Sequence, residues 1–417
     1  MRTWYHSFDF WSLFYWLGLV ILGLTAIYST TQGEAHQYLE GSVKNNFERQ
    51  LVWLGIATLA MCTILFIPVR QYIDLALPGY CVCILLLIAA LMFGREVGGA
   101  RSWVYIGPYG FQSSELAKVG AILAVARLFS TRQQGSTLHI ILLAVGLVLL
   151  PAVLIILQND MGTALVFIGL VPIVLFWAGT PLWVMILLVT PAIAGYLAIL
   201  YMPAALGFTA VLAIALALWY RDVRIGAAGA FVSGGTVAAA YFALAKVLQP
   251  HQVARIHAFA NPESEEFRSG VGFHLMQSKA AIGSGGLSGL GFMQGTQTQG
   301  AYIPEQSTDF VFSVIGEELG FLGAVLVLAL FTLLLIRLMQ LATQMNHPFG
   351  IMVAACTAGM LLIQVYINVG MVLGLLPVIG IPLPLMSYGG SALLANTIIL
   401  AIVLNLYMRR KEFALYV

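Results

Sequence analysis

The chain has 417 residues, of which 60% are hydrophobic and only 9% are charged. A soluble domain carries about 25% charged residues, so this composition excludes a soluble globular protein. The apolar runs are continuous and close to the length of a membrane crossing, which excludes a transmembrane β-barrel. We therefore expect an all-α polytopic membrane protein that forms a single membrane domain over residues 1–417, and the net charge of +2 gives no sign of nucleic-acid binding.

Twelve apolar stretches are predicted to form membrane-spanning helices. In chain order they cover residues 10–28, 51–68, 73–93, 115–129, 138–157, 162–179, 182–202, 204–220, 225–248, 310–336, 349–374 and 388–408. The weakest pair is 204–220 and 225–248, because both segments are rich in Ala and Gly. Arg221 and Arg224 between them predict a hairpin with a cytoplasmic turn, since charged residues are costly in lipid.

The basic residues of the short connections predict the orientation, because cytoplasmic loops carry an excess of Lys and Arg. With the N-terminus inside, the inner connections collect Arg2, Arg70, Arg127, Arg132, Arg221, Arg224, Arg337, Arg409, Arg410 and Lys411. The outer short loops hold only Lys44, Arg49, Arg95 and Arg101. We expect both termini in the cytoplasm and the long polar segment 250–309 on the outer face.

The first polar cluster on the predicted outer side runs over residues 98–118. Arg101 and Trp103 are residue types that suit a phosphate and a sugar ring. Glu115 and Lys118 are three residues apart and share a helix face, so they are predicted to pair. The pair is either structural or part of a substrate site, and the sequence leaves both open. Glu317 or Glu318 could also belong to this network.

Asp309 closes the long outer segment and directly precedes the span 310–336. Carboxylates at the water–lipid boundary are expensive to keep, so they are read as functional by default. The alternative is that Thr308 or Asp309 simply caps the next helix. Glu317 and Glu318 lie inside that helix and need partners, either Lys118 or a capped backbone.

Three other segments complete the predicted outer face. Asp160 precedes the span 162–179 and is interpreted first as its N-cap, with a place in the same cavity as the alternative. Residues 377–391 are rich in Pro and Gly, include Ser387, and predict a non-helical segment lining a cavity. The glycines of 283–291 do not follow a strand, so a phosphate-binding fingerprint is not predicted, and we expect a flexible loop.

Several of these motifs resemble the SEDS family of bacterial shape, elongation, division and sporulation proteins. The resemblance runs nearly end to end and rests on residues 100–103, 111–118, 160–163, 261–263, 277–286, 308–310 and 382–391. Within the family, residues 295–299 before Pro304 and Glu305 are similar to the RodA-like branch rather than to the FtsW-like branch.

The resemblance implies a peptidoglycan glycosyltransferase that polymerises lipid II during cell-wall elongation and shape maintenance. It also implies two kinds of partner, a class B penicillin-binding protein that supplies the transpeptidase and other membrane proteins of the elongation complex. The family's essential aspartate falls on Asp309, and its tryptophan, glutamate and lysine fall on Trp103, Glu115 and Lys118. An α-linked donor that gives a β-linked chain implies inversion by direct displacement.

The predicted chemistry needs a base for the acceptor hydroxyl and cations for the leaving pyrophosphate. Asp309 is the predicted catalytic residue, as this base or as ligand to a divalent cation, Mg or Mn. The predicted substrate-binding residues are Arg49, Arg101, Trp103, Glu115, Lys118, Asp160 and Ser387. Among them, Arg49, Arg101 and Lys118 are the candidates to hold the pyrophosphate.

The chain departs from the family pattern in two places. Asn159 and Met161 flank Asp160 where the family usually has Pro and Leu. Family members usually have ten spans, so residues 204–248 are predicted to be an additional hairpin.

Two other classes of function are also compatible with many helices. A flippase for lipid-linked precursors should show a charge path near mid-span, and a non-catalytic scaffold would need neither Asp309 nor Glu115.

Overall fold

The computed structural model describes residues 7–39, 41–97, 99–106, 109–130, 138–246, 253 and 271–413. The chain forms two compact units, one made of residues 1–174 and 277–417 and the other of residues 175–276. The motif at residues 261–263 and most of the first half of the long polar segment lie outside the described residues.

Every predicted span is helical, with 310–336 divided between two helices, and the order along the chain is the predicted one. The long helices of the larger unit are α1 (Phe10–Gln32), α3 (Asn46–Phe66), α4 (Val69–Phe93), α5 (Ser113–Ser130), α6 (Leu138–Leu157), α7 (Met161–Trp177), α15 (Gly320–Thr343), α16 (Pro348–Val372) and α17 (Gly390–Met408). Short helices between them are η2 (Glu34–Gln37), α2 (Gly41–Lys44), α12 (Val271–Ser284), α13 (Thr296–Gln299), α14 (Val311–Glu318) and α18 (Arg410–Phe413).

Ten helices of the described chain are long and apolar enough to cross a membrane, which confirms a multi-pass helical membrane protein. Helix α7 is a shorter apolar helix of 17 residues. Helix α5 carries Glu115, Lys118 and Arg127, which lower its hydropathy. With α5 and α7 the helices match the twelve predicted stretches.

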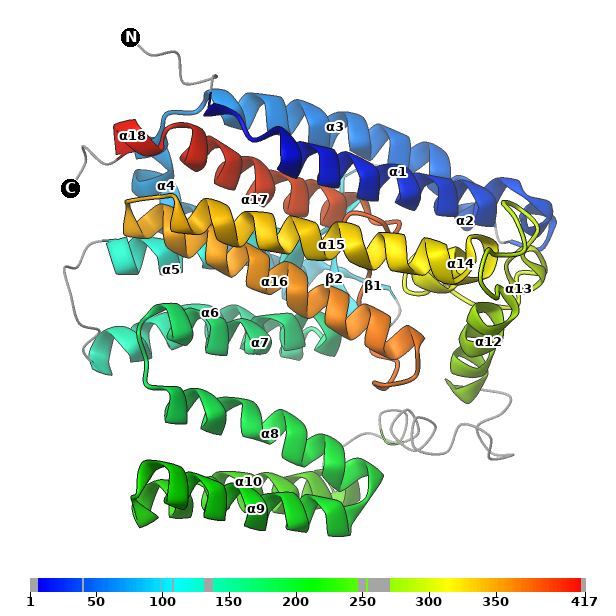
Figure 1. The fold of residues 1–417 in the computed structure, drawn as a ribbon. Coiled ribbons are helices and arrows are strands. Elements are labelled where there is room, and N and C mark those ends of the chain that lie inside the picture. The colour runs from blue at the N-terminus through cyan, green and yellow to red at the C-terminus, as the bar shows by residue number, and fades with distance from the viewer. Residues whose placement is uncertain are drawn as a thin grey trace. The chain divides into compact units, whose positions relative to one another are not determined.

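Helices α16 and α17 form the centre of the larger unit together with α5. The most apolar windows of α16 and α17 are 78% and 89% buried, whereas those of the other candidate spans are at most 39% buried. Helix α5 packs against α4, α6, α16 and α17, and Figure 1 shows α1, α15, α16 and α17 running lengthwise beside one another. The surrounding helices expose apolar faces, as lipid-facing helices do.

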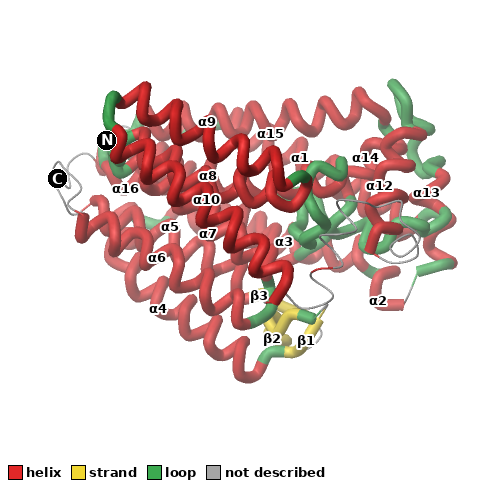
Figure 2. Tube along the Cα trace, turned by 90° about the horizontal axis from the view of Figure 1, so that it is seen from below, coloured by secondary structure: helices red, strands yellow, loops and turns green. Residues whose placement is uncertain are grey.

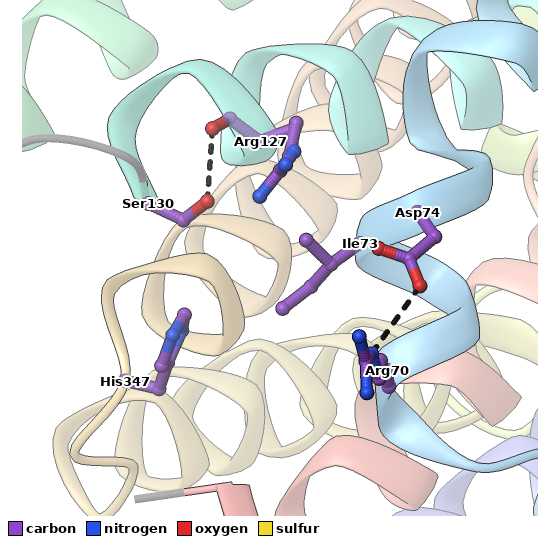
Figure 3. Close-up of a pocket in the computed structure, with 6 residues that line it drawn as sticks. All are labelled: Arg70, Ile73, Asp74, Arg127, Ser130 and His347. Atoms are coloured by element: carbon purple, nitrogen blue, oxygen red, sulfur yellow. Dashed lines mark hydrogen bonds and ion pairs between the residues drawn. The ribbon is translucent and has the colours of Figure 1, made fainter. Parts of the chain in front are cut away.

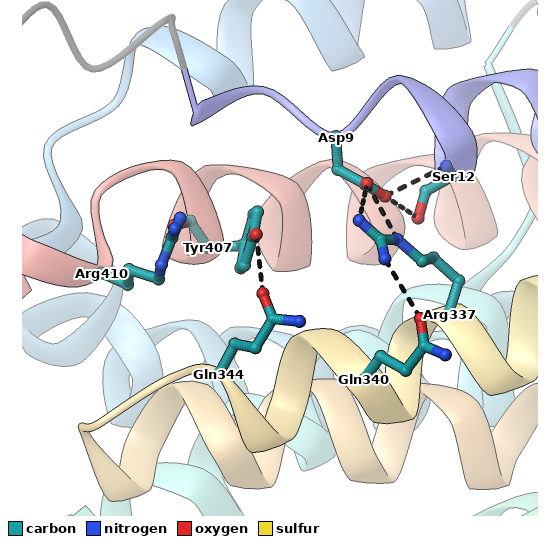
Figure 4. Close-up of polar contacts among 7 residues, drawn as sticks. All are labelled: Asp9, Ser12, Arg337, Gln340, Gln344, Tyr407 and Arg410. Atoms are coloured by element: carbon teal, nitrogen blue, oxygen red, sulfur yellow. Dashed lines mark hydrogen bonds and ion pairs between the residues drawn. The ribbon is translucent and has the colours of Figure 1, made fainter.

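The start of α1 and the short helix α18 lie at one end of this unit, and α13 and α14 lie at the other (Figure 1). At the first end, Asp9 caps α1 by accepting a hydrogen bond of 3.1 Å from the Ser12 backbone N–H. The Arg337 guanidinium of α15 lies 2.9 Å from the same carboxylate and 3.1 Å from Gln340 (Figure 4). This ion pair ties α1 to α15.

A small antiparallel sheet precedes α5 and was not predicted from the sequence. Its strands are β1 (Arg95–Val97), β2 (Ala100–Ile106) and β3 (Tyr109–Gln112), in the order β1-β2-β3. Trp103 on β2 is paired with Gln112 on β3, and Figure 2 shows the three strands together beside the helix ends. The strands are too short, and too broken by glycine and proline, to give a readable alternation of polar and apolar residues.

The predicted helix 310–336 is interrupted, because α14 ends at Glu318 and α15 begins at Gly320. Gly320 has a φ of +67°, and a Cβ at this residue would lie 2.2 Å from the Gly289 nitrogen. Leu290 N–H donates to the Glu317 carbonyl at 3.0 Å, and Gly291 N–H donates to the Glu318 carbonyl at 3.1 Å. The expectation of a flexible glycine loop is therefore wrong, since the glycines allow close backbone contact with the break.

The smaller unit contains α8 (Leu182–Leu200), α9 (Met202–Tyr220) and α10 (Val223–Lys246). Helices α9 and α10 form the predicted hairpin, which turns at Arg221 with a φ of +52°. Gly226 lets the two helices approach closely, because a Cβ there would lie 2.6 Å from Ala217. A hydrogen bond of 2.7 Å between Thr209 and Ser233 adds a polar contact further along the pair.

Candidate active site

Asp309 lies in the turn that leads into α14. Its backbone N–H donates to the Glu305 carbonyl at 3.1 Å, and the residue is half-buried. Helix α14 begins after Phe310, and no side chain caps its first turn. Thr308 turns back and donates to the Glu305 carboxylate at 2.8 Å. The structure therefore places the N-cap of α14 at Phe310, one residue after Asp309.

The broken Pro/Gly segment before α17 lies directly against this turn. The Asn368 side chain on α16 donates to the Asp309 carbonyl at 2.9 Å and to the Ile381 carbonyl at 2.7 Å. A Cβ added at Gly380 would lie 3.1 Å from Asp309 Oδ2, and Gly380 has a φ of +80°. The carboxylate thus lies against bare backbone, and Asn368 fixes the turn and the segment together.

Helix α3 fixes the end of the same segment. Gln50 donates to the Ser387 carbonyl at 3.3 Å and accepts from the Gly389 N–H at 3.2 Å. Asn46, one helical turn earlier, donates to the Ser307 hydroxyl at 3.3 Å. Both amide side chains are buried. The polar face of α3 therefore holds the Asp309 turn and the Ser387 segment in register.

Arg49 is brought to this region by the same helix. Its charge acts on the Tyr388 hydroxyl, and the Tyr388 N–H donates to the Ser307 carbonyl at 2.8 Å. Burial raises the pKa of the Tyr388 phenol and Arg49 opposes that shift, so the hydroxyl is protonated at neutral pH. The Arg49 cation and the neutral Tyr388 phenol therefore lie close in space to the turn that carries Asp309.

Asp160 is the N-cap of α7, as predicted. Its carboxylate accepts hydrogen bonds of 3.0 Å from both the backbone N–H and the hydroxyl of Thr163. It also accepts from the Gln112 side chain at 2.8 Å, which ties the sheet to α7. A Cβ at Gly162 would lie 3.0 Å from Ile381, so the start of α7 packs on the segment that touches Asp309. Asp160 thus both caps its helix and borders the candidate site.

The remaining predicted residues occupy different positions around this centre. Ser387 is buried, and its hydroxyl accepts from the Leu383 N–H at 2.8 Å, which closes the turn of the Pro/Gly segment. Trp103 is half-buried on β2. Arg101 is 60% exposed and lies 3.8 Å from Glu96, while its backbone is fixed to the connection before α7. The structure records no direct contact of Trp103 or Arg101 with the Asp309 turn in the residues it describes.

Glu115 and Lys118 form the predicted ion pair in the first turn of α5. The Lys118 ammonium lies 2.9 Å and 2.8 Å from the two carboxylate oxygens, and both side chains are only 3% exposed. The pair lies on the helix that packs against α16 and α17. Burial of two charges in this way is tolerated only when they pair closely.

The two glutamates at the end of α14 have partners of their own, and Lys118 is not one of them. Glu317 accepts from the backbone N–H groups of Gln297 and Thr298 at 2.7 Å and 2.9 Å, and from the Thr298 hydroxyl at 2.6 Å. Glu318 accepts from Ser29 and from Gln299. The capped backbone proposed for these acids is confirmed for Glu317, which caps α13.

Sequence reasoning missed Asn46 and Gln50. A signal for them exists, because two amides four residues apart share one face of a helix that is apolar beyond its first turns. They were overlooked because neither carries charge. Their buried hydrogen bonds make them positioning residues for the candidate site.

The helices and the buried polar turn define a polytopic membrane protein with a candidate active site at one end of its bundle. The chain belongs to the FtsW/RodA/SpoVE family of cell cycle proteins, which matches residues 10–225 and 202–412. The two matches overlap at residues 202–225, and all but the first two of these belong to the stretch 204–248 that is predicted to be an additional hairpin. The resemblance to the SEDS family and its RodA-like branch is confirmed.

Named relatives cover nearly the whole chain. The peptidoglycan glycosyltransferase RodA of Treponema pallidum is 31% identical over 97% of this chain and 98% of that protein. The peptidoglycan glycosyltransferase MrdB of Escherichia coli K12 is 33% identical over 87% of this chain and 86% of its own.

Solved structures show the same fold. A chain from work on the structural coordination of polymerization and crosslinking by a peptidoglycan synthase complex has a TM-score of 0.70 at 30% identity, over 97% of this chain and 99% of its own. The rod shape determining protein RodA of Thermus thermophilus has a TM-score of 0.62 at 29% identity, over 97% of both chains.

Proposed function

We propose that this protein is a peptidoglycan glycosyltransferase that polymerises lipid II into glycan strands during cell-wall elongation. The relatives named above carry that activity in their names. The observation that carries the assignment of the site is the Asp309 turn. Asp309 directly precedes Phe310, the N-cap of α14, and α16, the Pro/Gly segment and α3 hold the turn in place.

In the proposed mechanism, Asp309 acts on the acceptor sugar. Its carboxylate takes the proton from the attacking hydroxyl while the lipid pyrophosphate of the donor leaves from the opposite face. One direct displacement inverts the configuration at the sugar carbon. Asn368 holds the Asp309 backbone, so the carboxylate keeps its direction as the substrate binds.

Charge on the leaving pyrophosphate needs a cation, and Arg49 is the best placed of the predicted residues. It lies beside Tyr388 at the segment bonded to Ser307. Arg101 is the second candidate, because its exposed contact with Glu96 contributes little and leaves it able to turn toward a substrate. Lys118 is already paired and buried, so we assign it to positioning α5 rather than to the pyrophosphate.

The other residues shape the site in this proposal. Trp103 offers a flat apolar face to a sugar ring, and Asp160 and Ser387 keep the surrounding backbone in place. A divalent cation, Mg or Mn, belongs to the proposal as a possible cofactor at Asp309. The described residues contain no cluster of three metal ligands, but Mg²⁺ commonly binds through one carboxylate and the phosphates of a substrate. Such an ion would neutralise the leaving pyrophosphate.

We place the site on the outer face of the cytoplasmic membrane, with both termini inside. The excess of Lys and Arg in the inner connections supports this orientation. We further propose that a class B penicillin-binding protein crosslinks the strands made here, and that other membrane proteins of the elongation complex assemble with the pair. The similarity to a chain studied within a peptidoglycan synthase complex supports such a partner.

The direct test uses purified protein, lipid II, and the class B penicillin-binding protein with its transpeptidase serine replaced. Glycan strands should form with the pair, and the protein alone shows whether the partner is needed. Strand formation should stop when lipid II is omitted or the membrane protein is left out. Transport of lipid II across a vesicle membrane with no strand formation would contradict the proposal and favour a flippase.

A further inference from the structure

A polar pocket lies at the opposite end of the larger unit from Asp309. Its lining residues are Arg70, Ile73, Asp74, Arg127, Ser130 and His347 (Figure 3). Asp309 precedes α14 and His347 follows α15, and α15 alone has 24 residues, about 36 Å of helix. The pocket is therefore separate from the candidate active site, and nothing in the proposed reaction uses it.

The pocket forms where three helices meet. Arg70, Ile73 and Asp74 belong to the first turns of α4, while Arg127 and Ser130 belong to the last turn of α5. His347 is the N-cap of α16. Its volume is about 340 Å³, which is large enough for a phosphate with a small organic substituent. The positive ends of the α4 and α16 dipoles lie at its rim, and the negative end of the α5 dipole lies there too, next to the Arg127 charge.

The charges of the lining favour an anion. Two arginines face one aspartate. Arg70 and Asp74 lie 3.6 Å apart, but their side chains are 73% and 60% exposed, so this contact contributes little and leaves Arg70 able to turn. Among the described residues, no hydrogen bond or ion pair is recorded for the Arg127 guanidinium. An arginine in this position can bind two phosphate oxygens with its planar fork.

His347 is the most buried polar member of the lining. It is only 5% exposed, and its Nδ1 accepts from the Phe349 N–H at 3.2 Å. Burial, together with the nearby Arg127 charge, lowers the pKa of His347, so the ring is neutral at pH 7 and its proton lies on Nε2. A neutral imidazole leaves the two arginines as the cations of the pocket.

We infer that this pocket binds an anionic phosphate group, with Arg127 and Arg70 as its ligands. The group is either the headgroup of an anionic membrane lipid or a phosphate-bearing solute. Basic pockets between helices at a membrane surface bind anionic headgroups in this way. The bound anion would link α4, α5 and α16, which include two of the most buried helices of the unit.

The test measures binding without any glycan synthesis, so its outcome is independent of the proposed function. Detergent-purified protein is titrated with phosphatidylglycerol and, as the zwitterionic control, phosphatidylcholine, and bound lipid is counted by native mass spectrometry. A parallel thermal-shift titration uses inorganic phosphate. Preferential binding of phosphatidylglycerol assigns a lipid headgroup, and stabilisation by phosphate that competes with the lipid assigns the shared anion site.

Variants of the lining make the test specific. Arg127→Gln and Arg70→Gln should each weaken binding about tenfold, because each removes a charge-assisted contact. Asp74→Asn should tighten binding by removing the opposing charge. Arg224→Gln, an exposed arginine on the α9–α10 turn, is the matched control and should bind as the unaltered protein does. Equal anion binding by all four variants would overturn the inference. It would also be overturned if the unaltered protein did not prefer phosphatidylglycerol to phosphatidylcholine and was not stabilised by phosphate.

Discussion

The ion pair between Glu115 and Lys118 shows how this protein keeps full charges inside a bundle of apolar helices. Both side chains are almost completely buried, and the ammonium contacts both carboxylate oxygens. Taking two charges out of water costs several kcal/mol for each ion, and a close partner offsets most of that cost. The pair therefore stabilises α5 only as long as both members are present.

Replacing Lys118 by Ala should destabilise the protein by about 3–5 kcal/mol, because it leaves a carboxylate buried without its counter-charge. The measurement is thermal unfolding in detergent, and glycan synthesis by the same sample should fall as well. A melting temperature equal to that of the unaltered protein would mean that Lys118 is solvated and dispensable.

The double variant Glu115→Gln with Lys118→Met separates a structural pair from a substrate-lining pair. It removes both charges at similar volume, so the stability lost in Lys118→Ala should largely return. If activity returns with stability, the pair only positions α5. If stability returns and activity does not, one of the two side chains acts on the substrate.

Helix α13 and the break between α14 and α15 show what short elements contribute. Glu317 binds two backbone N–H groups of α13 with its carboxylate, and the glycine segment pairs with the broken helix through its own backbone. Together these contacts build a compact structure between α12 and α14. Its residues lie on both sides of the Asp309 turn in the chain.

Glu317→Ala should release α13, because four hydrogen bonds to a buried carboxylate are lost. We expect a loss of at least about 2 kcal/mol in local stability. Hydrogen exchange at the amides of Gln297 and Thr298 should accelerate strongly. Glu305→Gln, an exposed carboxylate nearby, is the control and should leave these amides protected. Unchanged protection in Glu317→Ala would show that α13 does not depend on this cap.

The helices could be predicted from the sequence because each has a long apolar stretch bounded by polar residues, as for 138–157 and 349–374. The sheet β1–β3 and the break at Gly320 could not. Three short strands leave no period long enough to read. The break depends on a backbone contact with Gly289, thirty-one positions earlier. The residues around Gly320 do not indicate a contact with a segment so far away in the chain.

The site, like the fold, could be predicted from the sequence only where local spacing determines it. The N-cap role of Asp160 and the pairing of Glu115 with Lys118 followed from local spacing, and both are present. That Asn368 joins Asp309 to the Pro/Gly segment, and that Gln50 fixes Ser387, depended on helices meeting in space. Arg101 was predicted as a site residue because of its charge. The neutral side chains of Asn368 and Gln50 are the ones that hold the Asp309 turn and the Pro/Gly segment in place.

At the scale of the whole molecule, the hairpin α9–α10 is the predicted departure from the ten-span pattern that the resemblance implies for the family. Its two helices are each long and apolar enough to cross a membrane. Arg221, Asp222 and Arg224 form the turn between them, and such charges are costly in lipid. An added pair of crossings leaves the predicted side of every other loop unchanged.

Cysteine labelling tests this topology. An Asp222→Cys variant should react with a membrane-impermeant maleimide only after the membrane is opened, since the turn is predicted to be cytoplasmic. Glu305→Cys, an exposed position on the predicted outer side, should react in intact spheroplasts and serves as the matched control. Labelling of Asp222→Cys from outside intact spheroplasts would show that the hairpin or its orientation is wrong.

The central claim is that Asp309 carries out the chemistry of a glycosyltransferase at this turn. Asn at this position keeps the side-chain size and leaves the Asn368 contact to the backbone carbonyl intact, but it cannot accept the acceptor's proton. The control is Glu305→Gln, four residues earlier in the same turn, which should retain activity.

The most direct measurement is glycan strand formation from lipid II by purified Asp309→Asn protein with its class B penicillin-binding partner. The account predicts at least about a hundredfold loss of strand synthesis, the scale of a missing general base, with thermal unfolding unchanged. Strand formation at the rate of the unaltered protein, by a properly folded Asp309→Asn sample, would contradict it.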